Sequence, residues 1–123
     1  MRPADGATWG HPYGGDAFPF PTERFSVIRH TVTFRLIHPD GSDAEAAFLQ
    51  TACELADIPG VTKFEQLRQV GSKNDFTFGF SMEFADAAAY AVYDNHPTHV
   101  AFVAQRWVPE VADFLELDYE PLV

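Results

Sequence analysis

The chain has 123 residues and a formal net charge of −10, because 18 Asp and Glu outnumber 8 Lys and Arg. Chains of this length usually form one domain, and such acidity excludes the basic surface that nucleic-acid binding requires. Hydrophobic residues make up 46% of the chain, which is enough for a packed core and argues against a disordered acidic polymer. Cys53 is the only cysteine and no apolar run is long enough to cross a bilayer. We therefore expect a soluble cytoplasmic protein with neither nucleic acid nor membrane as a partner.

Residues 1–24 are predicted to form an arm outside the folded domain. The first 22 residues hold four of the eight glycines and four of the nine prolines, which disfavour regular helices and strands. The same stretch carries Trp9, Tyr13, Phe18 and Phe20, so it is more apolar than a plain linker. This composition favours an arm packed on the body of the protein or on a neighbouring subunit, with a leader of no fixed structure as the alternative. The domain itself is expected to span residues 25–123.

The first strand is predicted over residues 28–36 by the alternation of its side chains. Its apolar face carries Ile28, His30, Val32, Phe34 and Leu36. After a turn at 38–41, Ser42 and Glu45 have the spacing of a capping box, which begins a helix. This helix should run to about Ala56 and bury one stripe, made of Ala44, Phe48, Ala52 and Leu55.

Two further strands are predicted before the second helix. Residues 61–70 form a weak apolar pattern, and the turn residues 71–75 follow it. The next strand, 76–84, alternates without a fault. Its apolar face carries Phe76, Phe78, Phe80, Met82 and Phe84.

The last third of the domain is predicted to hold two helices and a strand. Asp86 caps a helix that runs through Tyr93. A second helix should extend from His99 to Trp107 and be broken by Pro109. The final strand is indicated by apolar residues that alternate with acidic ones, namely Leu115, Leu117 and Tyr119.

The resulting order, β-α-β-β-α-α-β, predicts an α+β, ferredoxin-like fold: a four-stranded antiparallel sheet with helices on one face. The other face of the sheet is then open, and we expect it to carry Val27, Val61 and several threonines. A small sheet with such a face commonly packs against a copy of itself. We therefore predict a homodimer formed by sheet-to-sheet packing.

Polar rings at two places make candidate functional residues. His30 interrupts the apolar face of the first strand, where it is either a core histidine bonded to the backbone or part of a site. Tyr93, His96 and His99 are three residues apart around Pro97, so their rings can converge. An imidazole in the first turn of a helix favours its neutral form, which suits His99 to act as a general base. Tyr93 could then orient or donate to a carbonyl group.

The remaining predictions concern the ligand. We expect Phe34, Phe78, Phe80 and His96 to contribute to a ligand-binding pocket, although His96 is also well placed to cap the turn with its ring. Three histidines suit several transition metals, but the spacing of His96 and His99 is unusual for a shared metal site. We therefore predict no metal and no cofactor, and a small carbonyl-bearing apolar molecule as the possible ligand.

Four segments together resemble the stress-responsive A/B barrel (Dabb) family. They are residues 29–35, residues 58–61, the Tyr-x-x-His-Pro-x-His block at residues 93–99, and Asp118-Tyr119. The resemblance covers about residues 25–122 and implies a ferredoxin-like domain that dimerises into an α+β barrel. One plant member of the family closes a linear polyketide thioester by aldol condensation. By similarity to that cyclase, His99 would be the base, Tyr93 its partner at the carbonyl and His30 a supporting group.

The sequence leaves three functional interpretations open. The first is a dimeric Dabb protein of uncertain biochemical role, with a small apolar pocket edged by His30, Tyr93 and His99. The second is a cofactor-free enzyme of the cyclase or lyase type that acts on a carbonyl-bearing small molecule. The third is a dimeric-barrel monooxygenase.

Overall fold

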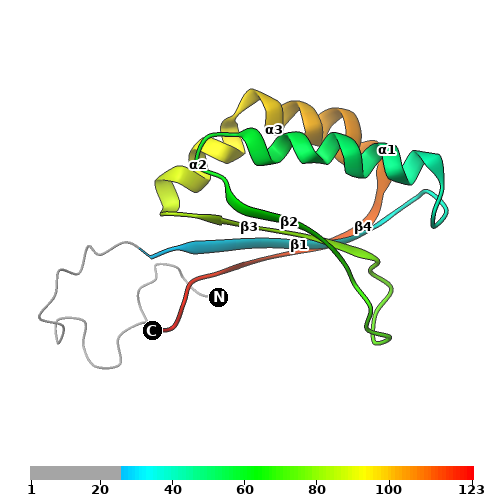
Figure 1. The fold of residues 1–123 in the computed structure, drawn as a ribbon, viewed down its shortest axis with the longest axis horizontal. Helices are drawn as coiled ribbons and strands as arrows, with labels where there is room; N and C mark the ends of the chain where they lie inside the picture. Colours follow the sequence, from blue (N-terminus) through cyan, green and yellow to red (C-terminus); the bar gives the residue numbers. More distant parts are fainter. Residues whose placement is uncertain (1–25) are drawn as a thin grey trace, which may run out of the picture.

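The structure is a computed structural model that describes residues 26–123, so the predicted arm lies outside the described residues. Within them, four strands form one sheet in the order β2-β3-β1-β4, with every neighbouring pair antiparallel. Three helices cover one face of this sheet (Figure 1). The predicted α+β, ferredoxin-like fold is confirmed. The strands are β1 (Ile28–Leu36), β2 (Thr62–Arg68), β3 (Phe78–Phe84) and β4 (Val111–Tyr119), and the helices are α1 (Asp43–Ala52), α2 (Ala87–Asn95) and α3 (Pro97–Phe102).

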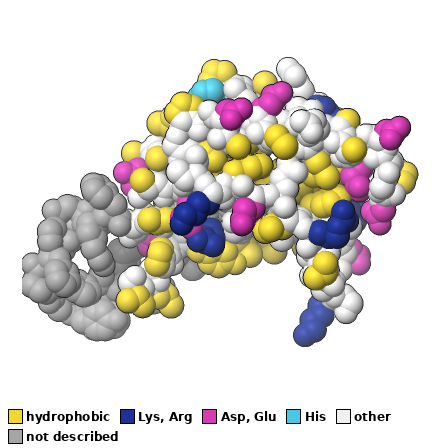
Figure 2. All heavy atoms as spheres, viewed as in Figure 1, with side chains coloured by type: hydrophobic (Ala, Val, Ile, Leu, Met, Phe, Trp, Pro, Cys, Tyr) yellow, Lys and Arg dark blue, Asp and Glu magenta, His cyan; other side chains and the backbone are white. Residues whose placement is uncertain are grey.

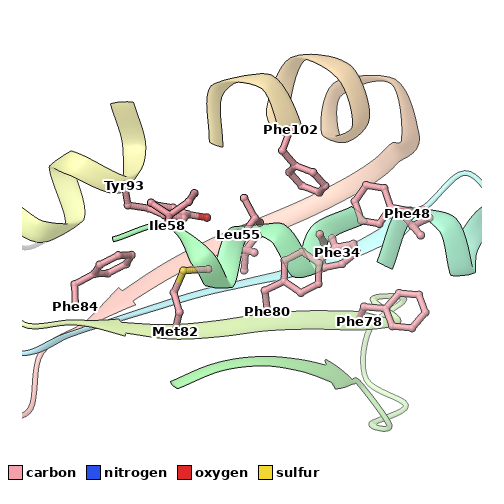
Figure 3. Packing of buried hydrophobic residues seen from close by; sticks show 13 residues of the cluster. Phe34, Phe48, Leu55, Ile58, Phe78, Phe80, Met82, Phe84, Tyr93 and Phe102 are labelled. Atoms are coloured by element: carbon pink, nitrogen blue, oxygen red, sulfur yellow. The ribbon is translucent and has the colours of Figure 1, made fainter. Parts of the chain in front are cut away.

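An aromatic core fills the space between the sheet and the helices. In Figure 3, Phe80 and Phe84 rise from β3 toward the helical layer and Phe102 reaches from α3 toward the sheet. Phe34 is fully buried, and its ring centroid lies 4.7 Å from that of Phe80. The alternation predicted for the third strand is confirmed from Phe78 onward, whereas Phe76 precedes β3 and is only partly buried.

The first helix begins as predicted but buries a different stripe. The Ser42 hydroxyl accepts a hydrogen bond from the Glu45 N–H at 3.2 Å, which confirms the cap. The Glu45 carboxylate folds back to accept from the N–H of Gly41 at 3.0 Å. Glu45 is therefore buried while Ala44 is exposed, and the prediction that Ala44 packs in the core is wrong. Phe48, Ala52 and Leu55 are buried as expected, with Leu55 in the short 3₁₀ helix η3 (Cys53–Asp57).

The last helical segment is longer than the sequence predicts. His96 caps α3, so the helix begins at Pro97 rather than His99. It then widens into a π-helical turn, η4 (Val103–Trp107), and continues as α4 (Val108–Glu110). The segment ends at Glu110, one residue after Pro109, so the helix includes the proline and stops directly after it rather than before it.

A polar clamp ties this helical segment to the start of the domain. The Glu110 carboxylate accepts hydrogen bonds from Arg106 and from the His38 ring, and Arg106 also donates to the Thr51 hydroxyl at 2.9 Å. The Arg106 guanidinium, aided by His38, holds the pKa of Glu110 below its usual range despite partial burial. The Ile37 N–H donates to the Glu110 carbonyl oxygen at 2.8 Å. Within residues 26–123, no helix is long and apolar enough to cross a membrane.

The face of the sheet opposite the helices is open and partly apolar. The register pairs Thr33 with Leu115 and Thr31 with Leu117, so the leucines of β4 lie on this face. Both leucines are about half exposed, and Figure 2 shows hydrophobic side chains among charged ones along the surface of the domain. The prediction that Val61 lies on the open face is wrong. Val61 sits in a turn, with its N–H bonded to the Ile58 carbonyl, and packs against the core.

Candidate functional site

A cavity of about 470 Å³ lies between the sheet and the segment formed by α3, η4 and α4. This volume falls in the range of sites for small organic ligands. Ring distances divide its lining into two groups. The polar group centres on His30, Tyr93 and His99, with Tyr93 6.1 Å from His30 and 4.4 Å from His99 between ring centroids. The apolar group surrounds Trp107 and consists of Phe80, Phe102 and Phe114, at 6.4, 6.5 and 5.6 Å from its ring.

His99 is held in one orientation by the end of the preceding helix. Its Nδ1 lies 3.0 Å from the carbonyl oxygen of Asp94, in the last turn of α2. Because a carbonyl oxygen can only accept, Nδ1 must carry the proton of this bond. In the neutral imidazole Nε2 is then an unprotonated acceptor. The chain thus presents a His99 whose free nitrogen can take a hydrogen bond or a proton.

Tyr93 is the buried neighbour of His99. Only 2% of its surface is exposed, and burial raises the pKa of its phenol, with the negative charges of Asp94 and Glu116 acting in the same direction. Tyr93 therefore stays protonated throughout the physiological range and can donate a hydrogen bond. A residue with a donor phenol and one with an acceptor imidazole are therefore neighbours in the lining of the cavity.

His30 belongs to a network that joins β1, β4 and α2. Its ring is 6% exposed, and Nδ1 lies 2.6 Å from Asp118 Oδ1. The hydroxyl of Tyr90 donates to Asp118 Oδ2 at 2.9 Å and also lies 2.9 Å from His30 Nδ1. A second carboxylate, Glu116, approaches Nδ1 to 3.5 Å. Burial and the bond to Asp118 raise the pKa of Tyr90, so this phenol remains a donor.

Not all predicted ligand-binding residues lie at the cavity. His30, Tyr93, His99 and Phe80 line it. Phe34 packs in the core beside Phe80, and Phe78 lies further along β3, so neither belongs to the lining. The His96 ring instead accepts a hydrogen bond from the Thr98 N–H at 3.1 Å, which makes it the cap of α3.

Three of these side chains have the composition of a metal-ligand set. The ligating atoms of His30, Glu116 and Asp118 lie within 4.8 Å of one another. Imidazole and carboxylate groups suit several divalent metals. The same groups also form hydrogen bonds within the protein, His30 with Asp118 and the Tyr90 hydroxyl with Asp118 and Glu116.

A family model for the stress-responsive A/B barrel domain, Dabb, matches residues 28–121. The chain belongs to the Dabb family. Among solved structures, a Dabb protein with a ferredoxin-like fold from Mesorhizobium loti is 60% identical, and the match covers 80% of this chain and 99% of that one with a TM-score of 0.79.

Two other structures share the fold with this Dabb protein. A dimeric ferredoxin-like protein of unknown function from a Jannaschia species is 25% identical, covering 77% of this chain and 99% of that one with a TM-score of 0.58. The hydroxynitrile lyase from Passiflora edulis is 18% identical, covering 77% and 93% with a TM-score of 0.68, which shows the shared fold alone. No curated protein matches the chain.

Sequence reasoning on this Dabb protein missed the partners of its histidines. Tyr90 lies three residues before Tyr93, on the same side of α2, and that helical spacing was an available signal. The alternation of the last strand gives Glu116 and Asp118 no role beyond its polar face, and Asp118 enters otherwise only as part of a segment that resembles the family. The β1–β4 register pairs them with Val32 and His30, which places both acids on the helical side of the sheet. That register could not be read from either strand alone.

Proposed function

We propose that the cavity of this Dabb protein binds a small, largely apolar molecule through one carbonyl-type oxygen. The observation that carries the proposal is the pairing of a protonated Tyr93 phenol with the His99 ring at 4.4 Å between centroids, beside a wall of aromatic side chains. A few convergent polar groups in an otherwise apolar cavity are typical of small-molecule sites. The phenol would donate to the ligand oxygen, and the aromatic wall would hold its apolar part.

A second candidate function is cofactor-free proton transfer of the cyclase or lyase type. It is favoured by the bond from His99 Nδ1 to the Asp94 carbonyl, which leaves Nε2 as a base of fixed tautomer. If Nε2 removed a proton from the carbon next to a carbonyl, the negative charge would develop on the carbonyl oxygen. The Tyr93 phenol would stabilise that oxygen by hydrogen bonding.

One probe tests both functions. The ketone 4-phenylbutan-2-one combines an aromatic tail with one carbonyl group that has acidic neighbouring protons. Calorimetric titration of the full chain should detect binding, and Tyr93→Phe should weaken it by about tenfold, the worth of one lost hydrogen bond to the ligand. Exchange of the ketone's α-protons in D₂O, followed by NMR, reports proton abstraction.

The two readouts separate the candidates. Binding that depends on Tyr93, without accelerated exchange, supports the binding function alone. Accelerated exchange that His99→Ala removes supports the enzyme. Val92→Ala, on the exposed side of α2, is the control and should change neither readout. Binding that Tyr93→Phe leaves untouched would contradict the proposal.

We also propose that the open face of the sheet forms a homodimer interface. Leu67, Leu115, Leu117 and Tyr119 are 42–51% exposed there, on a sheet whose other face is covered. An exposed apolar face on a small domain marks an association site. The related Jannaschia protein is dimeric, which supports a dimer of this chain.

Light scattering tests the assembly directly. At micromolar concentration we expect a mass of twice the 13.7 kDa chain. Leu117→Glu should shift the mass toward that of one chain, because it places a charge in the apolar centre of the interface. The matched change Val100→Glu, on the exposed surface of α3, should not. A wild-type protein that runs as a single chain would refute the interface.

A further inference from the structure

The charges around the cavity all have the same sign. Two carboxylates, Asp94 and Glu116, belong to its lining. Among residues 26–123, no Lys or Arg lines it. Three basic side chains form ion pairs with acids outside the cavity lining. Arg29 and Lys63 pair with Glu83, and Arg106 pairs with Glu110.

The two imidazoles do not offset this imbalance. His30 Nδ1 already faces Asp118 at 2.6 Å and Glu116 at 3.5 Å, so a proton on that ring would balance carboxylates of the protein itself. His99 Nδ1 donates to the Asp94 carbonyl, and the Nε2 of the neutral ring is an acceptor that offers an anion no hydrogen-bond donor. An anionic ligand would enter a partly buried site with acidic neighbours and no cation reserved for it, and such burial of an unpaired charge is costly.

We infer that the cavity selects uncharged ligands and rejects carboxylates and other anions, and that Glu116 is the residue that sets this selection. This inference rests on the proposed binding function and narrows its ligand class. Glu116 is suited to the role by position. It extends from the edge strand β4, its side chain is 49% exposed, and its Oε2 lies 3.4 Å from the Tyr90 hydroxyl. An incoming ligand would meet this carboxylate beside the polar rings. Repulsion of the wrong ligand is a general route to specificity.

A matched pair of probes tests the selection. The ketone 4-phenylbutan-2-one and the ion 3-phenylpropanoate have the same size and shape, since the methyl group of the first is replaced by a charged oxygen in the second. Titrated at pH 7.5, the wild-type chain should bind the ketone at least about tenfold more tightly than the carboxylate, because like charges at close range cost this much or more. Glu116→Gln should reduce the ratio by about threefold or more, mainly through tighter carboxylate binding. Asp94→Asn should act in the same direction.

Glu120→Gln is the control, because it makes the same change in net charge outside the cavity lining, on an exposed residue beyond β4. It should leave the ratio unchanged. Equal or tighter binding of the carboxylate by the wild type would overturn the inference while leaving the binding function standing. The inference would also be overturned if Glu116→Gln and Glu120→Gln changed the ratio of ketone affinity to carboxylate affinity by the same factor. If the ketone itself fails to bind, the proposed binding function fails and the inference falls with it.

Discussion

Replacing Phe34 with Ala is expected to lower the free energy of unfolding by about 3–5 kcal/mol, the range for truncating a fully buried phenylalanine. Phe34 is 0% exposed and stands at the centre of the aromatic core. Its ring centroid lies 4.7 Å from Phe80, 5.0 Å from Trp107 and 5.8 Å from Phe48. An alanine at this position on β1 would remove these ring contacts. The surrounding side chains could fill the resulting void only in part. Since small domains are stable by about 5–15 kcal/mol, this loss is a large fraction of the total stability.

Urea denaturation at one fixed protein concentration measures this loss, because the stability of an associating protein depends on concentration. Val92→Ala removes apolar groups from the exposed surface of α2 and should change stability by less than about 0.5 kcal/mol. A loss below about 1.5 kcal/mol for Phe34→Ala would contradict this prediction, because it would mean that the core closes around the void.

The parts of the fold that sequence could predict are those set by local periodicity. In β1 every second residue from His30 to Leu36 is buried, so the strand pattern identified both the strand and its buried face. In β3 the alternating apolar residues from Phe78 to Phe84 are all buried, as the pattern predicts. The caps at Ser42 and Asp86 were predictable for the same reason, since each depends on residues three positions apart. Among the site residues, His30 stood out because a polar ring interrupts an apolar face.

What sequence could not predict depends on contacts between distant segments. The alternating sequence of β4 is equally compatible with leucines that face the helices. Only the pairing with β1 shows that the acidic residues lie on that side of the sheet. Ala44 seemed a core residue by spacing, but Glu45 turns inward to bond the backbone of Gly41. The π-helical turn that places Trp107 in the cavity has no local signal that we recognise. The hydrogen-bond network around His30 therefore follows only from the pairing of β1 with β4 in the structure.

That network leads to the second large effect, which a double-mutant cycle between His30 and Asp118 measures. Asp118→Ala leaves the buried Nδ1–H of His30 without its 2.6 Å partner, so we expect a loss of about 1–3 kcal/mol in the free energy of unfolding. Asp118→Asn keeps an oxygen acceptor and should cost less. In a His30→Phe background the buried N–H is absent, so Asp118→Ala should then cost little.

The coupling free energy of the cycle, obtained from urea denaturation of the four proteins, should therefore be about 1–3 kcal/mol. The cycle also separates the contribution of His30 to the stability loss from that of Tyr90. The Tyr90 hydroxyl loses its bond to Asp118 in both backgrounds, so this loss cancels, and it retains Glu116 at 3.4 Å. A coupling near zero would mean that the His30 ring is held by packing against Phe84 and Tyr93 rather than by Asp118. A strong coupling would instead mean that an edge strand fixes the orientation of a histidine at the cavity, because β4 contributes the carboxylate and β1 the ring.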